Sequence, residues 1–236
     1  MSRPHAVVLA APGTNRDADV GFALQRAGAD ARTVLLAELR HNPALLRDAQ
    51  MLVVAGGFSY ADALGAGRMW SLALQHGVGD ELTSFVAHGK PVIGICNGFQ
   101  VLTRTGLLPG ALGHNSSGHF QCEWVALEAP AGNCVWTNGL DPFECPIAHG
   151  EGRYVHPDPD ALRAAGQVAL RYIGHNPNGS TADIAGVCDA SGVVLGLMPH
   201  PENHVLPRQH PRFTRGTVGG LGLALFERGV AHARQV

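Results

Sequence analysis

The sequence lacks the patterns that several common kinds of site require. No two cysteines stand in C-x-x-C spacing, which argues against a zinc ribbon. No glycine-rich segment has the form G-x-G-x-x-G or ends in G-K-[S/T], so we expect no dinucleotide or ATP site in this chain. Seventeen Lys and Arg against 19 Asp and Glu leave a formal net charge of −2. This balance gives no general attraction to nucleic acid or to an anionic membrane.

Long apolar runs are missing as well. The first apolar segment, 6–11, is too short for the core of a signal peptide or for a membrane span. Five cysteines are an odd number, and a chain of 236 residues is not small, so we expect no disulfide framework. These features predict a cytoplasmic protein in a reducing compartment, without a membrane or nucleic-acid partner.

The first half of the sequence alternates short apolar segments with helical patterns. Apolar strands are expected over Ala6–Ala11, Thr33–Ala37, Met51–Ala55 and Val92–Ile95. Helices are expected from Asp17 or Asp19 to Gly28, over Pro43–Ala49, within Gly67–His88 and behind Cys96. Strands that are separated by helices indicate βαβ units and a parallel sheet with both faces covered.

The second half has a different character. It predicts strands over Phe120–Leu127 and Gln167–Tyr172, a hairpin of Asp183–Val187 with Val193–Leu197, and a terminal helix within Gly219–Ala233. We find no linker, low-complexity tract or internal repeat in the sequence. The prediction is therefore a single domain over residues 1–236, with a central parallel sheet and added antiparallel strands.

The most informative segment is Pro91–Gln100. Its apolar strand ends at Cys96, and Gly94 and Gly98 flank this cysteine in the pattern G-x-C-x-G. The serine form of this pattern is a nucleophile elbow, a sharp turn from a strand into a helix that exposes the side chain. A cysteine there lies at the positive end of a helix, where a thiolate is favoured. The alternative is a small buried core residue, which is the commoner use of cysteine at a strand end.

A base for this thiol is expected at His200-Pro-Glu202, which follows the late strand Val193–Leu197. Residues i and i+2 of an extended segment point to the same side, so Glu202 could orient the imidazole of His200 toward the thiol. His200 could instead be a solvated turn residue. A metal site with His204 is not expected, because extended geometry separates the two histidines and no further ligand cluster stands out.

Two backbone N–H groups are candidates for an oxyanion hole. Gly57 follows the third strand, in Gly56-Gly57-Phe58-Ser59, and Asn97 follows the cysteine. In a parallel sheet, such loops meet at the carboxyl edge of the strands. Both groups could then stabilise negative charge that develops beside the thiol.

Taken together, the elbow and the Pro199–Glu202 segment resemble the class I, triad-type glutamine amidotransferases. Further segments narrow the resemblance to the glutaminase subunits of phosphoribosylformylglycinamidine synthase. These segments are Gly56–Gly67, Asn115–Phe120, Ile147–Tyr154 and Asn176–Ser180. The match runs from about Val7 to the end of the chain.

The resemblance implies a flavodoxin-like, doubly wound α/β fold, a three-layer sandwich with a mostly parallel central sheet and added antiparallel strands. It implies a glutaminase that hydrolyses L-glutamine and supplies ammonia to a large synthetase subunit, together with a small accessory subunit. The whole complex would convert formylglycinamide ribonucleotide to formylglycinamidine ribonucleotide in purine synthesis. ATP and magnesium would bind the synthetase subunit, and this chain would carry no cofactor.

The resemblance also assigns roles to individual residues. Cys96 would be the nucleophile, His200 the general base and acid, and Glu202 the group that orients the histidine. Gly57 and Asn97 would supply the oxyanion N–H groups.

Gln100 would help to hold the glutamine substrate.

The sequence departs from the family pattern directly after Glu202, where we expect Arg and find Asn203-His204. The segment Arg208–Arg215 is also unusual for the family. Both departures lie beside the candidate triad.

Two rival interpretations stay open at this point. The first is another cysteine hydrolase of the same fold, such as a γ-glutamyl hydrolase or a relative of the cysteine peptidase and chaperone group. The second is an inactive, regulatory glutaminase-like subunit. Such a subunit usually lacks the cysteine or the histidine, and this sequence has both.

Overall fold

Five parallel strands form one half of the main sheet. They are β1 (His5–Ala10), β2 (Asp30–Leu35), β3 (Met51–Val54), β4 (Val92–Ile95) and β11 (Val194–Leu197), in the spatial order β2-β1-β3-β4-β11. This is the strand order of flavodoxin-like folds. All residues of β3, β4 and β11 are buried, as expected where helices cover both faces of a sheet.

Four antiparallel strands extend the same sheet beyond β11. They are β10 (Ile184–Cys188), β9 (Val168–Ile173), β6 (Gln121–Glu128) and β7 (Phe143–His149), in that order. A separate pair is formed by β5 (Ala111–Gly113) and β8 (Arg153–Val155). The predicted hairpin of β10 with β11 is present, and the predicted fold class is confirmed.

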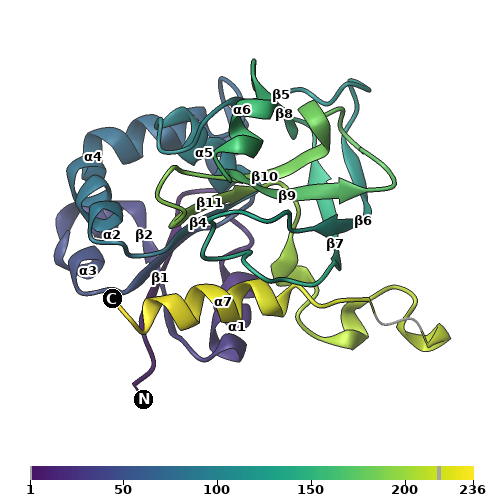
Figure 1. Ribbon diagram of the computed structural model, residues 1–236. Coiled ribbons are helices and arrows are strands. Elements are labelled where there is room, and N and C mark those ends of the chain that lie inside the picture. The colour runs from purple at the N-terminus through teal and green to yellow at the C-terminus, as the bar shows by residue number, and fades with distance from the viewer. Residues whose placement is uncertain (1, 217–218) are drawn as a thin grey trace.

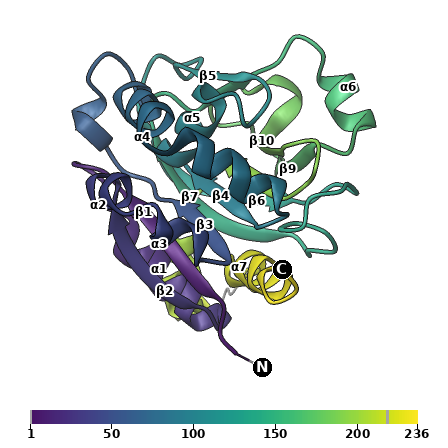
Figure 2. The same ribbon diagram turned by 90° about the vertical axis from the view of Figure 1, so that its left-hand side faces the viewer.

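Helices cover both faces of the sheet, as Figures 1 and 2 show. On one face α1 (Asp17–Ala27) packs against α7 (Leu223–Ala233), and on the other α4 (Arg68–Ala87) packs against α5 (Asn97–Arg104). The remaining helices are α2 (Leu36–His41) and α3 (Ala44–Arg47), which lie beside α4, and α6 (Pro159–Ala164). Short 3₁₀ turns cover Ser59–Asp62, Thr181–Asp183, Pro201–Asn203, Pro207–Gln209 and Phe213–Arg215.

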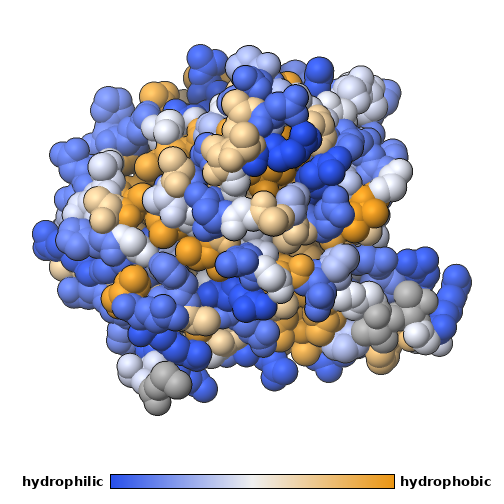
Figure 3. Space-filling view, in the orientation of Figure 1, coloured by the Kyte–Doolittle hydropathy of each residue, from blue (hydrophilic) through white to orange (hydrophobic). Residues whose placement is uncertain are grey.

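This computed structural model describes residues 2–216 and 219–236. Met1, Thr217 and Val218 of the predicted domain lie outside the described residues. No helix within those two ranges is long and apolar enough to cross a membrane. On the face in Figure 3, apolar side chains form separate patches between hydrophilic ones.

The elements β5, β8 and α6 were not predicted, and two further differences from the prediction have a clear physical reason. The second strand was expected to continue to Ala37, but α2 begins at Leu36, because Leu36 and Leu39 lie three residues apart and bury the same face of a helix. Strand β7 was missed because it contains Pro146, a residue that breaks a central strand. The structure resolves this conflict by placing β7 at the edge of the sheet.

Two glycines allow α5 to lie directly on the sheet. A Cβ on Gly98 would lie 1.9 Å from the carbonyl oxygen of Val54 in β3, and a Cβ on Gly94 would lie 2.6 Å from the carbonyl oxygen of Gly98. Neither glycine has a positive φ angle. Glycine is therefore needed at both positions for space.

We expect Gly98→Ala to lower the free energy of unfolding by about 1–3 kcal/mol, because the added methyl group must push α5 away from β3. Urea denaturation measures this loss. A matched control is Gly21→Ala in the interior of α1, where a Cβ would meet no atom within 4 Å. That variant should gain about 0.5–1 kcal/mol. Equal stability of the two variants would contradict the proposed close packing.

Candidate active site

Cys96 lies at the sharp turn between β4 and α5. Its backbone has φ 51° and ψ −105°, a conformation that a residue with a side chain rarely adopts. Such a conformation costs about 1–3 kcal/mol and persists only where the surrounding structure enforces it. The Sγ atom is not used to cap α5 and lies 3.9 Å from the carbonyl oxygen of Ala148. The thiol is therefore held at the carboxyl edge of the sheet, as an elbow requires.

His200 and Glu202 form a buried pair beside this thiol. Nδ1 of His200 donates to Oε1 of Glu202 at 2.7 Å. The imidazole and Cys96 lie against the same glycine, because a Cβ on Gly56 would lie 3.2 Å from Cε1 of His200 and 3.4 Å from Cβ of Cys96. The backbone N–H of His200 donates to the carbonyl of Pro146 at 2.8 Å, so the edge strand β7 fixes the histidine. The segment does not extend as expected, because Pro201–Asn203 forms a 3₁₀ turn, but the turn still brings the carboxylate to the imidazole.

The electrostatics of this group favour a protonated imidazole. Burial by itself lowers the pKa of His200, but the negative charge of Glu202, the proximity of Cys96 and the hydrogen bond to Glu202 outweigh it and raise the pKa above its usual value. The second carboxylate oxygen of Glu202, Oε2, is buried and has no partner among residues 2–216 and 219–236. The arrangement can hold a proton close to the sulfur atom and donate it to a leaving group.

The candidate oxyanion residues both lie next to Cys96 or its pocket. Gly57 has φ 138°, and a Cβ there would lie 2.7 Å from the backbone nitrogen of Asn15, so only glycine fits. Asn97 is the first residue of α5, where an N–H group has no acceptor within the helix. The oxyanion role of the two N–H groups stays a prediction.

Gln100 lines the pocket, but other side chains and backbone groups satisfy its amide. Its Oε1 accepts from Nδ2 of Asn97 at 2.9 Å, and its Nε2 donates to the carbonyl of Glu151 at 2.7 Å. The hydroxyl of Ser59 donates to Oδ1 of the same asparagine. Gln100 therefore connects α5 to the turn that carries Glu151, and its predicted contact with glutamine stays a prediction.

A pocket of about 150 Å³ opens beside Cys96. Residues from segments 57–66, 96–100 and 148–151 line it, together with Phe120. A larger cavity of about 520 Å³ lies between Arg47, α4 and Lys90. Lys90 precedes β4, whereas Cys96 follows it. The larger cavity therefore lies at the amino ends of the parallel strands, opposite to Cys96, and contains none of the candidate residues.

Sequence patterns did not identify three residues of this pocket, Asp62, His149 and Glu151. All three lie in the segments Gly56–Gly67 and Ile147–Tyr154, which carried the family resemblance. The family resemblance identified these segments, but it did not assign a role to each of their side chains. Only the folded chain shows that both segments line one pocket.

Asn178, in the Asn176–Ser180 segment, supports the wall of the pocket. Its Nδ2 lies 3.1, 2.9 and 3.2 Å from Nε2 of His149, the carbonyl oxygen of Gly152 and the hydroxyl oxygen of Tyr172, and its two protons are shared among these three acceptors. Its Oδ1 accepts from the N–H and the hydroxyl of Ser180, which fixes the orientation of the amide. Nε2 of His149 is therefore an acceptor, and the proton of this neutral imidazole is on Nδ1.

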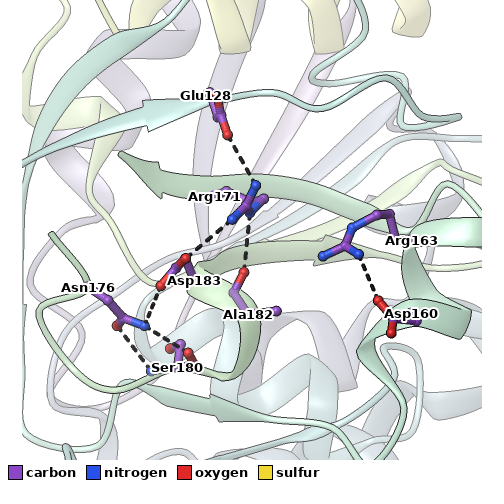
Figure 4. A network of polar contacts seen from close by, with 8 residues as sticks. All are labelled: Glu128, Asp160, Arg163, Arg171, Asn176, Ser180, Ala182 and Asp183. Carbon is purple, nitrogen blue, oxygen red and sulfur yellow. Dashed lines mark hydrogen bonds and ion pairs between the residues drawn. The ribbon is translucent and has the colours of Figure 1, made fainter. Parts of the chain in front are cut away.

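A network of polar contacts in turn holds this segment (Figure 4). Arg171 of β9 pairs with Glu128 and Asp183 and donates to the carbonyl of Ala182. Asn176 donates to Asp183 at 3.0 Å and to the carbonyl of Ser180 at 2.8 Å. The amide side chains and the serine of segment 176–180 therefore make contacts that hold this segment in place.

The residues that depart from the family pattern after Glu202 have partners of their own. Asn203 donates to Asp19 of α1 at 3.2 Å. His204 and His210 both contact the ring of Trp124 edge-on, with ring centroids 4.9 and 4.7 Å apart. His204 Nδ1 donates to the carbonyl of Glu144 at 2.6 Å. These contacts hold the segment against β6 and β7.

Comparison with known proteins supports the same interpretation. The model of a family described as a CobB/CobQ-like glutamine amidotransferase domain matches residues 3–233. The chain belongs to this family. The glutamine amidotransferase that the sequence predicts is therefore confirmed at the level of family and enzyme class.

Individual glutamine amidotransferases are similar over almost the whole chain. A phosphoribosylformylglycinamidine synthase subunit PurQ from Treponema denticola is 45% identical, over 88% of this chain and 90% of the relative. The PurQ subunit from Dehalococcoides mccartyi is 38% identical over the full length of both chains. The structure of PurLQS from Thermotoga maritima contains a chain with a TM-score of 0.81 and 37% identity, with 97% of this chain and 98% of that chain covered.

His149 makes a pH-dependent contribution to stability. Burial and the nearby charge of His200 lower the pKa of His149 from 6.5 to about 3. Between these values the unfolded chain binds a proton that the folded chain does not. The free energy of unfolding should therefore fall as the pH drops through this range, by up to about 1.4 kcal/mol per pH unit.

We expect the wild type to lose stability more steeply than His149→Asn between pH 6.5 and 4. Urea denaturation at several pH values in both proteins measures the two slopes. The raised pKa of His200 acts in the opposite direction, with stability lost as pH rises above 6.5, and it is common to both proteins. Identical slopes would mean that His149 is not a buried neutral group.

Proposed function

We propose that this glutamine amidotransferase hydrolyses L-glutamine through a thioester on Cys96 and supplies the ammonia to an ATP-dependent synthetase subunit. The observation that carries the proposal is the buried pair of His200 and Glu202 beside Cys96, at the edge of a small pocket. A nucleophile, a base and a group that orients the base are the parts that covalent hydrolysis of an amide requires.

In the first half of the reaction, His200 takes the proton of the Cys96 thiol, and the sulfur attacks the side-chain amide carbon of glutamine. The N–H groups of Gly57 and Asn97 bind the oxygen that becomes negative. His200 then gives its proton to the amide nitrogen, the carbon–nitrogen bond breaks, and ammonia leaves. A γ-glutamyl thioester stays on the enzyme.

In the second half, His200 takes a proton from a water molecule, whose oxygen attacks the thioester carbon. The carbon–sulfur bond breaks, glutamate leaves, and the sulfur and the imidazole return to their starting state. Glu202 stabilises the positive charge of the imidazole in both halves.

The names of the relatives support the inferred partners. The two relatives reported above are PurQ subunits of phosphoribosylformylglycinamidine synthase, and one similar structure is that of PurLQS. We infer that this chain works with a large synthetase subunit and a small accessory subunit, in the formation of formylglycinamidine ribonucleotide. ATP and magnesium bind the large subunit in this account, and this chain carries no cofactor.

We also infer a cytoplasmic location, which the five free cysteines support.

Because ammonia that escapes into water is lost, we expect low activity of the isolated chain and stimulation by the synthetase subunit. The family membership of the chain disfavours the rival cysteine hydrolases. The inactive-subunit interpretation is tested directly through Cys96.

Cys96→Ala should remove synthesis from glutamine, with a loss of at least about a thousandfold. Synthesis from added ammonia should continue, because the synthetase site is intact. Both rates are measured on the assembled complex, and size-exclusion chromatography verifies the assembly. A variant complex that still uses glutamine would show that Cys96 is not the nucleophile.

Glu202→Gln should lower kcat for glutamine by about 10²–10⁴-fold, because the imidazole loses the charge that orients and stabilises it. His200→Ala should cost more, about 10⁵–10⁶-fold. The loss of the negative charge of Glu202 should also shift the pH dependence of kcat to lower pH. Equal losses in the two folded variants, without this shift, would assign Glu202 another role.

A further inference from the structure

Two carboxyl groups, Asp62 and Glu151, line the same pocket as Cys96. Neither forms an ion pair within the part of the chain that the structure describes. Arg104 approaches Glu151 near Gly65, but its Nε donates to the carbonyl of Ala66 at 3.1 Å. The pocket therefore holds two acids and no cation paired with either.

The two acids act on each other across the pocket. Partial burial, followed by the negative charge of Glu151, raises the pKa of Asp62. Two like charges in a partly buried site are unfavourable until a cation lies between or beside them. A positively charged ligand group would remove this repulsion.

Helix α5 fixes both acids relative to the nucleophile. Nδ2 of Asn97 lies 3.4 Å from Oδ1 of Asp62, and Nε2 of Gln100 donates to the backbone carbonyl of Glu151 at 2.7 Å. The N–H of Ala66 also donates to Oε1 of Glu151, at 3.3 Å. Because Asn97 and Gln100 stand one and four residues after Cys96, the acids keep a set position relative to the thiol.

A second feature of the pocket also indicates a polar ligand. His149 is 3% exposed and lines the pocket, and its Nδ1 has no partner among the described residues. Its other nitrogen accepts from Asn178, so Nδ1 carries an unused proton. A buried donor without a partner is costly unless a ligand uses it. The pocket thus has a free donor as well as the two acids.

We propose that Asp62 and Glu151 bind the α-ammonium group of free L-glutamine and select for the free amino acid. The proposal rests on the glutaminase function of this pocket. A free amino acid carries an ammonium group a few bonds from its side-chain amide, whereas a glutamine within a peptide and a des-amino amide have none. The two acids would then act as specificity determinants of the reaction at Cys96.

The test compares two substrates on the full chain assembled with its synthetase subunit. One substrate is L-glutamine, and the other is glutaramate, which is glutamine without the α-amino group. The variants are Asp62→Asn and Glu151→Gln, which keep the shape of each side chain and remove its charge. Glu227→Gln, on the exposed side of α7, makes the same chemical change away from the pocket and serves as the control.

We expect each pocket variant to lose about tenfold to a hundredfold in kcat/KM for L-glutamine, the size expected for a hydrogen bond to a charged group. The kcat/KM for glutaramate should change less than about threefold. The preference of the wild type for L-glutamine should therefore shrink in both variants. The control should keep wild-type values for both substrates.

Equal losses for the two substrates would overturn the proposal, because they would assign the acids a structural role in the pocket. Unchanged kinetics in both variants would also overturn it. Hydrolysis of neither substrate by the folded wild-type complex would instead refute the glutaminase function itself. Since the two acids are tested in separate variants, misfolding of one leaves the other as a test.

Discussion

Helix α5 begins so close to strand β3 that no side chain fits between Gly98 and the carbonyl oxygen of Val54. This contact fixes where the helix starts, and the turn before it must then be completed by one residue, Cys96. The strain at that turn falls on the cysteine itself, whose φ is 51°. Packing of the core thus holds the thiol in position before any substrate binds. The pocket, its acids and the imidazole are all arranged around this fixed atom.

The rest of the site comes from segments that are far apart in the sequence. The edge strand β7 accepts the backbone N–H of His200 through Pro146, and the turn after β7 carries Glu151. Asn178, from the loop between β9 and β10, supports the imidazole of His149 in the same wall. The antiparallel half of the sheet therefore does more than extend the fold, because β7 anchors the candidate base, which follows β11 of the parallel half, and supplies one side of the pocket. The parallel half supplies the nucleophile.

The parts of this structure that local sequence patterns encode were predicted correctly. Continuous apolar segments indicated β3, β4 and β11, and G-x-C-x-G marked Cys96 because its glycines are required by local packing. Strand β7 was missed, since Pro146 obscures an edge strand. The contact of Gln100 with Glu151 spans 51 residues of chain, and the proximity of Asp62 to Glu151 spans 89 (from 62 to 151). No local pattern encodes such contacts. The three residues of the candidate triad were found because they belong to short sequence motifs. Hydrophobic periodicity alone does not identify them.

The central claim is that Cys96 is the nucleophile of a glutamine pocket. Peptide mapping by mass spectrometry, after exposure to an electrophilic glutamine analogue, tests it most directly. The complex with the synthetase subunit should show modification of Cys96 alone among the five cysteines, and an excess of L-glutamine should prevent it. Modification of another cysteine, such as the exposed Cys122, or modification of Cys96 that glutamine does not reduce, would contradict the account.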